Sequence, residues 1–411
     1  MQGAWSAALG SDSTGQVRKS PLRIALADPP MTAILALTRV PGFTGPIEEG
    51  QSSGMAGGPI RQGGQHRVSR GTSCSVRLGR SFKASPPLLL ATLVLISGCR
   101  GPQSTFADAG LEASSVAALF WWMLGGAVLI WFFVIGLSVY ATKAHPGAHS
   151  DKTGLRLIIW GGCVFPTVVL TILLVFGLQM MPDFRAPANG PRIAISGERF
   201  WWRVFYDSPA EPGVARSLPH EGIESANEIW LPVGRRTELL LGSPDVIHSF
   251  WVPAIAGKTD TIPGRINRLV VEPTREGLYN GVCAEFCGTA HAQMAFRVRV
   301  VSQEDYETYV AAQGQPAAVL DHPGLDAFLA NGCGACHTVR GTEADGRVGP
   351  DLTHVASRET IGAGILAMNE ANLARFISST EHVKPGVQMP SFGVLPDEEI
   401  AAIAAWLGSL Q

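Results

Sequence analysis

The chain has 411 residues, more than one ordinary domain needs, so we expect two or three folded units with membrane or tail segments. A formal net charge of −2 and the lack of a long Lys or Arg run exclude a nucleic-acid-binding protein as the working hypothesis. Charged residues make up 16% of the chain, against roughly 25% in typical soluble domains, and the mean hydropathy is positive. This composition indicates membrane-embedded sequence.

The N-terminal part predicts targeting sequence rather than fold. Residues 1–75 are rich in Gly, Ser, Pro and Arg without a helical or strand period, so we expect them to be disordered or a mis-called extension of the true start. Residues 76–99 combine basic positions, a short apolar stretch and the ending Ser-Gly-Cys, which predicts a signal peptide. This ending resembles a bacterial lipoprotein signal, with Cys99 as the lipidated residue. A plain signal or an uncleaved anchor is the alternative.

Two long apolar runs follow, at 116–140 and 155–179, each near the roughly 20 residues that span a bilayer. Lys143, Lys152 and Arg156 cluster around the loop between them, whereas no Lys or Arg lies between Arg100 and Lys143. The positive-inside rule therefore predicts a cytoplasmic loop and both ends of the hairpin outside. A hairpin buried in a soluble core is the alternative.

The rest of the chain changes texture twice. Residues 190–302 hold short β-rich runs separated by turn residues, and Phe296, Val298 and Val300 alternate with arginines, which predicts an all-β sandwich or barrel. Residues 303–318 predict a short helical piece and a linker. Residues 319–411 have helical patterns at both ends, including a last helix after Pro396. We therefore expect an α+β membrane protein with an all-β domain and an all-α C-terminal domain.

A cluster of soft metal ligands lies at the end of the β-rich region. Two thiols four positions apart on one loop can each bridge two metal ions, and soft sulfur with imidazole favours copper over hard cations. A zinc site or a disulfide between the two cysteines is the alternative. The candidate ligands are His248, Cys283, the backbone carbonyl of Glu285, Cys287, His291 and Met294.

This segment resembles the CuA domain of cytochrome c oxidase subunit II, also at residues 226–235 and 257–267, and with the helical hairpin the resemblance covers about 105–305. The resemblance implies a cupredoxin fold and a dinuclear copper centre that relays electrons, with no catalytic residue in this chain. It also implies that the side chain of Glu285 contributes to a magnesium ion at the junction with subunit I.

A second constellation, Cys333-Gly-Ala-Cys336-His337, is the attachment pattern for haem c, with His337 as an axial iron ligand. Thioredoxin-like chemistry is the alternative, but it does not require the His. A high-potential carrier needs a Met as the second axial ligand. We assign Met389, before the last helix, because Met368 lies in an apparently helical run. The segment is similar to class I cytochromes c, which implies that the loop at Gly349-Pro350 holds the His ring.

Together, the resemblances imply subunit II of a proton-pumping cytochrome c oxidase of the caa type in a bacterial inner membrane, with both redox domains on the periplasmic side. Electrons would pass from haem c to the copper pair and on to subunit I, where oxygen is reduced to water. Expected partners are subunits I and III, and a cytochrome c or a quinol-oxidising complex as donor. The alternatives are an electron-transfer subunit of another terminal reductase, and a copper-delivery or assembly module.

Two departures from the family pattern stand out. The aromatic patch that receives electrons from a soluble cytochrome c reads Phe200-Trp201-Trp202 here, with Phe200 at the position of the usual Trp. Ordinary core packing is the alternative role for these aromatics. Many relatives also carry a Glu near the start of the second helix, at a proton channel, but this sequence has no acid between Thr153 and Met181.

Overall fold

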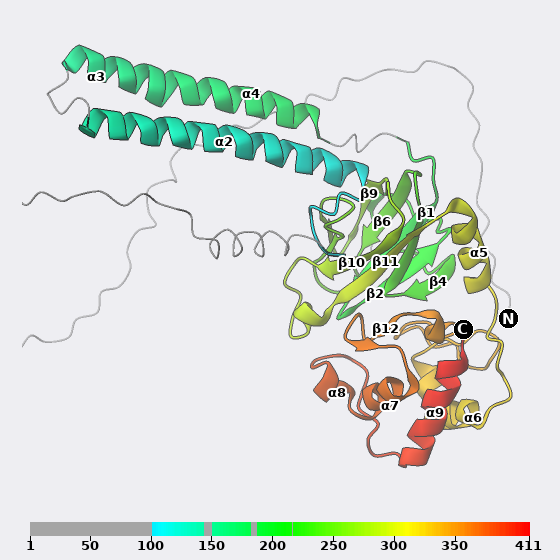
Figure 1. The fold of residues 1–411 in the computed structure, drawn as a ribbon. Helices are drawn as coiled ribbons and strands as arrows, with labels where there is room; N and C mark the ends of the chain where they lie inside the picture. The colour runs from blue at the N-terminus through cyan, green and yellow to red at the C-terminus, as the bar shows by residue number, and fades with distance from the viewer. Residues whose placement is uncertain (1–100, 144–149, 182–186, 216) are drawn as a thin grey trace, which may run out of the picture. The chain divides into compact units, whose positions relative to one another are not determined.

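A computed structural model describes residues 101–143, 150–181, 187–215 and 217–411 of the chain (Figure 1). These residues form two long apolar helices, a β-sandwich and a helical C-terminal module. The expectations for 1–75 and 76–99, including lipidation of Cys99, lie outside the described residues.

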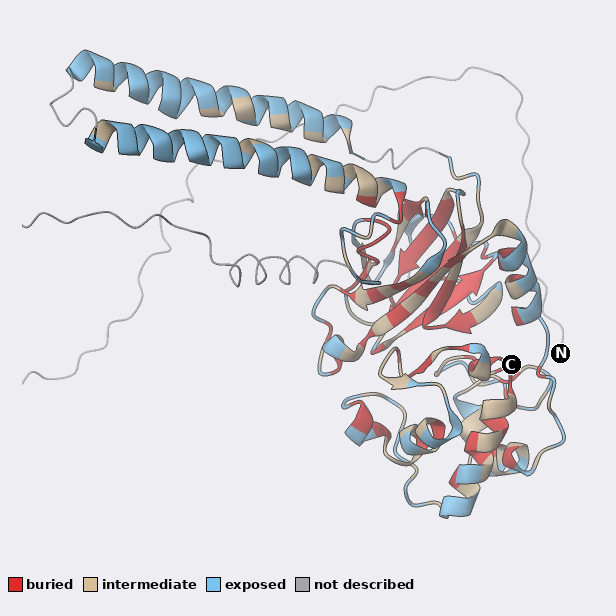
Figure 2. Ribbon diagram, in the orientation of Figure 1, coloured by how far each residue is buried: buried red, intermediate tan, exposed pale blue. Residues whose placement is uncertain are grey.

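The first apolar helix is α2 (Leu111–Lys143), and the second is built from α3 (Asp151–Leu157), the π-helical η1 (Ile158–Val164) and α4 (Phe165–Gln179). They are 33 and 29 residues long, and their apolar centres are not buried inside the protein. Figure 2 shows that both helices are exposed almost all round, and their exposed residues are largely apolar. This suits a lipid environment and not the core of a soluble domain. Glu112 in the first turn and Lys143 in the last turn of α2 complement the helix dipole.

The sandwich consists of two sheets, with strand orders β3-β9-β6-β1-β2-β4 and β5-β11-β10-β7-β8. Neighbouring strands pair antiparallel except for β1 with β6 and β11 with β5. The strands are β1 (Arg192–Glu198), β2 (Trp201–Tyr206), β3 (Gly213–Val214), β4 (Ile223–Ala226), β5 (Glu228–Pro232), β6 (Thr237–Gly242), β7 (His248–Trp251), β8 (Thr259–Thr261), β9 (Arg265–Val271), β10 (Gly277–Cys283) and β11 (Ala295–Val301).

Side-chain alternation builds the core between the sheets. In β11, Phe296, Val298 and Val300 are buried while the residues between them are partly exposed, as the sequence pattern predicted. They pack in one cluster with residues of the other sheet such as Ile193 and Trp202. Burial of each large apolar side chain contributes roughly 1.5–3 kcal/mol. The predicted all-β sandwich is thus confirmed.

Helix α5 (Gln303–Gln313) connects the sandwich to the C-terminal module. It begins where the Ser302 side chain accepts a hydrogen bond from the Asp305 amide, and it packs Tyr306 and Val310 on the sandwich core. The C-terminal module contains α6 (Pro323–Ala330), η3 (Cys333–Ala335), η4 (Val355–Ser357), β12 (Thr360–Ile361), β13 (Leu366–Ala367), α7 (Glu370–Ser378), α8 (Thr380–Val383) and α9 (Asp397–Ser409). Its core surrounds Phe328 and Trp406, whose rings meet edge to face.

The sequence predicted that Met368 lies in a helical run, over residues 365–377, and this prediction is wrong in its first third. The chain forms the short strand β13 there, and Met368 follows it outside any helix. The helix begins only at Glu370, because the Asn369 side chain accepts a hydrogen bond from the Asn372 amide and caps the first turn. A capping residue inside an apolar periodic run therefore moved the helix start.

Glu228 of β5 is a buried acid that contacts the C-terminal module, where it accepts a hydrogen bond from the Glu359 amide. Burial raises its pKa from 4.5 to about 7. The folded chain therefore binds a proton more tightly than the unfolded chain, and stability falls as pH rises from about 4.5 to 7, by up to ~3 kcal/mol. We expect Glu228→Gln to remove this loss, measured as unfolding midpoints at pH 5 and pH 8; equal pH slopes in both proteins would contradict the prediction.

Candidate metal and haem sites

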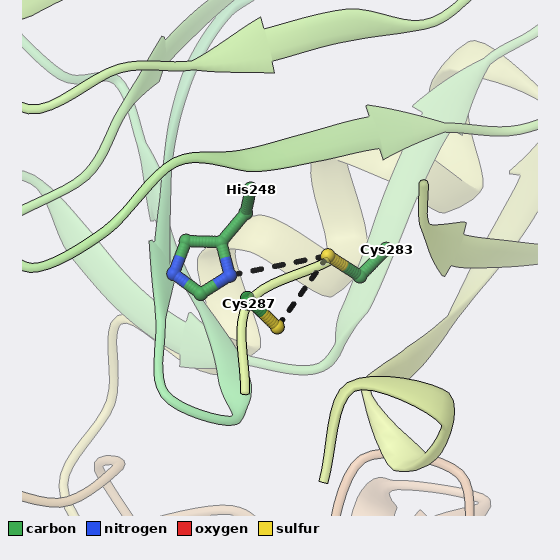
Figure 3. A group of neighbouring side chains, drawn as sticks. All are labelled: His248, Cys283 and Cys287. Atoms are coloured by element: carbon green, nitrogen blue, oxygen red, sulfur yellow. Dashed lines mark hydrogen bonds between the residues drawn. The ribbon is translucent and has the colours of Figure 1, made fainter. Parts of the chain in front are cut away.

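The predicted soft ligands form one chain of contacts. His248 begins β7, Cys283 ends β10, and the loop after β10 carries Cys287, His291 and Met294. Cys283 Sγ lies 3.9 Å from His248 Nδ1 and 3.9 Å from Cys287 Sγ (Figure 3). Cys287 Sγ lies 3.6 Å from His291 Nδ1 and 3.8 Å from Met294 Sδ. The two sulfurs therefore stand between the two imidazoles.

The same loop adds an oxygen donor. The Glu285 carbonyl lies 3.2 Å from Cys283 Sγ, while the residue is exposed. The 3.9 Å between the sulfurs is about twice the ~2.05 Å of a disulfide bond, and both cysteines are free. Two thiolates shared between two imidazoles, with a thioether and a carbonyl at the ends, suit a pair of soft metal ions.

Asp245 orients the His248 ring, which is fully buried. Its carboxylate lies 2.9 Å from His248 Nε2 and also accepts the amide hydrogens of Arg199 and Val246. This contact leaves Nδ1 directed at Cys283 as the available metal ligand. Burial opposes the charge on Asp245, but these hydrogen bonds outweigh it and hold the pKa of the carboxyl well below its usual range.

The two thiols differ in acidity. Burial acts to raise the pKa of both, but contacts with His248 and nearby backbone groups outweigh it and lower the pKa of Cys283. Burial and the adjacent charge of Cys283 raise the pKa of Cys287. A second negative charge at 3.9 Å is thus unfavourable unless positive charge lies between the sulfurs, which is what bound metal ions supply.

The aromatic patch lies between the two predicted sites. Trp202 is fully buried, its ring meets His248 edge to face, and its indole donates to the Met294 carbonyl at 3.4 Å. Phe200 and Trp201 line a pocket on the other side. Phe200 is also close to residues 284–294, the loop between β10 and β11 that we call the copper loop, since a Cβ on Gly288 would stand 3.0 Å from the Phe200 ring.

That pocket brings together the predicted haem ligands. It has a volume of about 390 Å³ and is lined by Cys333, Cys336, His337 and Met389 together with apolar side chains such as Phe328 and Leu407. Met368, the other candidate, also packs against the module core but is not among the residues that line this pocket. Two thiols, an imidazole and a thioether around one mostly apolar pocket fit a covalently attached haem.

His337 is held as the predicted proximal loop requires. Its Nδ1 hydrogen-bonds the Pro350 carbonyl at 2.8 Å, so Nε2 remains for an iron ion. Burial lowers the pKa of His337, which favours the neutral ring that a metal needs. A Cβ at Gly349 would come within 2.4 Å of the ring, so only glycine leaves room for this orientation.

Gly349→Ala is therefore expected to displace His337 and to weaken or abolish its bond to the haem iron. The added methyl group collides with the ring, and overpacking of this kind typically costs 1–3 kcal/mol. The measurement is the optical spectrum of the haem and the fraction of chain that carries it. Gly257→Ala is the control, because a Cβ there meets nothing within 4 Å. An unchanged haem spectrum in Gly349→Ala would refute the assigned ring orientation.

Three residues at these sites were not singled out from the sequence. Asp245 stands three positions before His248, a spacing that could have suggested its role. Arg203 and Lys384, both 2% exposed, touch the pocket region from opposite modules. Their sequence surroundings, an alternating strand and a polar turn, carry no signal for this.

Comparisons with known proteins assign both modules. Residues 211–301 match the family described as cytochrome C oxidase subunit II, periplasmic domain, and residues 323–411 match cytochrome c. Cytochrome c oxidase subunit 2 of Alkalihalophilus pseudofirmus is 32% identical over 358 residues, which is 82% of this chain and 99% of that protein. Its counterpart in Bacillus sp. (strain PS3) is 30% identical over 286 residues, 66% of this chain and 76% of that one.

A solved structure, the periplasmic domain of subunit II of cytochrome oxidase (CoxB) of Bradyrhizobium japonicum, is 29% identical and covers 31% of this chain and 95% of its own, with a TM-score of 0.26. The matched domains imply copper, haem and electron transfer. Two apolar helices and these relatives indicate a membrane-anchored chain with a periplasmic domain, associated with other oxidase subunits. With sequence identity extending over nearly the whole of a full-length relative, the chain belongs to the cytochrome c oxidase subunit 2 family.

Proposed function

We propose that this chain is the electron-relaying subunit II of a proton-pumping cytochrome c oxidase, passing electrons from its own haem c to a dinuclear copper centre and on to subunit I. The observation that carries the proposal is the adjacency of two cofactor-type sites. The copper-type ligand loop and the Cys-x-x-Cys-His pocket both border Phe200. In this role the chain has no catalytic residue of its own, and oxygen is reduced in subunit I.

The proposed copper ligands are His248, Cys283, the Glu285 carbonyl, Cys287, His291 and Met294. A delocalised copper pair would supply one-electron chemistry with little change of geometry. The chain's own part is rigidity. The Met294 carbonyl accepts hydrogen bonds from the Cys283 amide at 3.0 Å and from the Trp202 indole at 3.4 Å, and Asp245 holds the His248 ring. Fixed ligands keep the site the same in both oxidation states.

The proposed haem ligands are His337 and Met389, with thioether bonds from Cys333 and Cys336. A His and Met pair favours a high reduction potential. Pro350 sets the ring orientation of His337, and the apolar lining excludes water. We further propose that the Glu285 side chain contributes to a magnesium site where the copper loop meets subunit I.

The face beside the copper loop suits a partner subunit. Phe286 is 78% exposed and Ile247 is 44% exposed, although both adjoin metal ligands. Exposed apolar side chains around a site of this kind mark an interaction surface. We propose that subunit I covers them, that subunit III completes the complex, and that a cytochrome c or a quinol-oxidising complex reduces the haem.

We propose a bacterial inner-membrane location with both apolar helices spanning the bilayer, the loop between them in the cytoplasm, and residues 190–302 and 319–411 on the periplasmic side. The charges around that loop support this orientation. A signal peptide at 76–99 with lipidated Cys99 is part of the same proposal. Intact mass of the mature chain tests it.

The deciding experiment is purification of the native complex with metal counting, optical and paramagnetic spectra, and identification of the large subunit. We expect two coppers and one haem c per chain, one electron shared over both coppers, and an oxygen-reducing subunit I. A single zinc, an oxidised Cys283–Cys287 pair or easily released copper would overturn the relay. A nitric or nitrous oxide reductase as the large subunit would overturn the oxidase assignment while keeping the relay.

A further inference from the structure

The C-terminal module touches the sandwich beside both of its predicted haem ligands, at residues 347–349 near His337 and at Lys384 near Met389. Two buried basic side chains contribute to this contact, Arg203 from the sandwich and Lys384 from the C-terminal module, and each is 2% exposed. Both contacts involve the same short segment of the sandwich, because Lys384 donates to the Phe200 carbonyl, three positions before Arg203. The proposed relay leaves both residues without a role.

Arg203 links the sandwich to the His337 side of the pocket. Glu198 and Glu224 hold its guanidinium at 2.8 and 2.5 Å, and Trp201 lies beneath it with 4.5 Å to the ring centre. Glu198 also accepts from Nη2 at 3.1 Å, so two N–H groups remain. The remaining one on Nη2 faces the Arg347 carbonyl at 2.9 Å and the Val348 carbonyl at 3.5 Å, and the one on Nη1 faces the Gly349 carbonyl at 3.5 Å. The next residue is Pro350, whose carbonyl holds the His337 ring. A planar fork of five donors suits such a set of acceptors, whereas a lysine ammonium does not span it.

Lys384 forms the corresponding link on the Met389 side. Its Nζ atom donates to the carbonyls of Phe200 and Gly362, both at 2.6 Å. It precedes Met389 by five residues in a loop that also lies against the copper loop, since a Cβ on Gly386 would stand 3.2 Å from Thr289. Burial lowers the pKa of Lys384 to about 7. The neutral amine, like the ammonium, has enough N–H groups for both carbonyls, and removing it leaves these two acceptors without a partner.

The backbone adds to the same contact next to a copper ligand. The amide of Ala295, which follows Met294, donates to the Ala363 carbonyl at 3.1 Å, and the Gln293 side chain donates to the Val383 carbonyl at 3.4 Å. The copper loop therefore hydrogen-bonds directly to the module that carries the haem pocket. The two modules therefore share a specific interface, in contrast to two domains that are joined by a flexible linker and meet by diffusion.

We propose that Arg203 and Lys384 are positioning residues that fix the haem pocket against the copper loop, so that electrons cross at one constant separation. The inference rests on the proposed relay and deepens it. A fixed haem pocket also explains why Phe200 can replace the usual electron-entry Trp. The Phe200 side chain is 3% exposed and enclosed between the two sites, so an external cytochrome c cannot reach it, and an outside donor must reduce the haem.

The test uses the complete oxidase complex carrying Arg203→Gln, Arg203→Lys, Lys384→Met or the pair Arg203→Gln with Lys384→Met. Two quantities are measured: the haem-to-copper electron-transfer rate after photoreduction of the haem, and hydrogen exchange of the amides at 346–349, at 351–352 and at Ala295. We expect the double variant to lose at least tenfold in rate and to exchange faster at those amides, with haem and copper contents retained. Arg203→Lys should fall between, because it keeps the charge beside both glutamates without reaching the three carbonyls.

Arg192→Gln is the matched control, because it removes a similar arginine that pairs with Glu211 and Glu238 in the same sheet. Wild-type rates and exchange in the double variant would overturn the inference, as would an equal effect of Arg192→Gln. Should the Arg203 variants fail to fold, Lys384→Met alone decides by the same two measurements. If the wild-type complex lacks a copper pair, the proposed relay fails, while hydrogen exchange still tests the interface because it needs no metal.

Discussion

Replacing Cys287 with serine is expected to abolish the copper pair. Cys287 Sγ is the central atom of the site, within 3.9 Å of Cys283 Sγ, His291 Nδ1 and Met294 Sδ. A hydroxyl is a hard, weak ligand that cannot replace a bridging thiolate. The loss of copper affinity should exceed the roughly 10- to 100-fold that outer hydrogen-bonding partners contribute at metal sites. The measurement is copper per chain, together with the spectrum of an electron shared over two coppers.

Cys163→Ser is the matched control for this experiment, because Cys163 is a free, exposed thiol in η1, remote in sequence from the ligand loop. It should bind two coppers as the wild type does. If Cys287→Ser kept two coppers and the shared electron, the bridging role would be wrong and a different pair of ligands would have to hold the metals.

Replacing Met389 with histidine is expected to keep the haem attached but to lower its reduction potential. A thioether ligand raises the potential, whereas a second imidazole removes that effect. We expect a fall on the order of 0.2 V, about a quarter of the roughly 0.8 V range that axial ligands span. Since roughly 59 mV is a tenfold change for one electron, the haem-to-copper equilibrium would shift by about 10³-fold. Redox titration of the purified complex measures this.

Met368→His separates this assignment from its competitor. Met368 follows β13 and is not among the residues that line the haem pocket, so its replacement should leave the potential unchanged. A potential that moved with Met368 and stayed with Met389 would reverse the assignment of the axial ligand.

Much of the architecture was predictable because its signals are local. The alternation at Phe296, Val298 and Val300 predicted a half-buried strand, and β11 confirms it. The Cys-x-x-Cys-His run and the thiols at 283 and 287 are each written within a few residues. His248 is different, since 35 positions separate it from Cys283, and antiparallel pairing of β7 with β10 joins them. The chemistry of the ligand types and the resemblance to a known family connected those two residues in advance, whereas their spacing did not.

The interface between the modules was not predictable from these patterns. Arg203 lies in a strand with no unusual sequence pattern. The sequence around it does not predict that its side chain contacts carbonyls about 145 residues later in the chain. Lys384 sits in a polar turn of the kind that is usually solvated. Contacts of this sort arise from the docking of two folded surfaces, which has no sequence period. The predicted start of α7 was wrong for a local reason, because Asn369 caps the helix and makes it begin at Glu370.

The start of α2 is joined to the sandwich by the backbone itself. The amide of Ala109 donates to the Ala254 carbonyl at 2.9 Å, that of Leu111 to the Glu272 carbonyl at 3.0 Å, and Thr274 donates back to Ala109 at 2.8 Å. The rotation of this helix about its axis is consequently fixed by the sandwich, chiefly by the segment between β9 and β10. Inserting a single residue just after Leu111 would rotate the rest of α2 by about 100° about its axis. The helix would then present a different face to the neighbouring oxidase subunits.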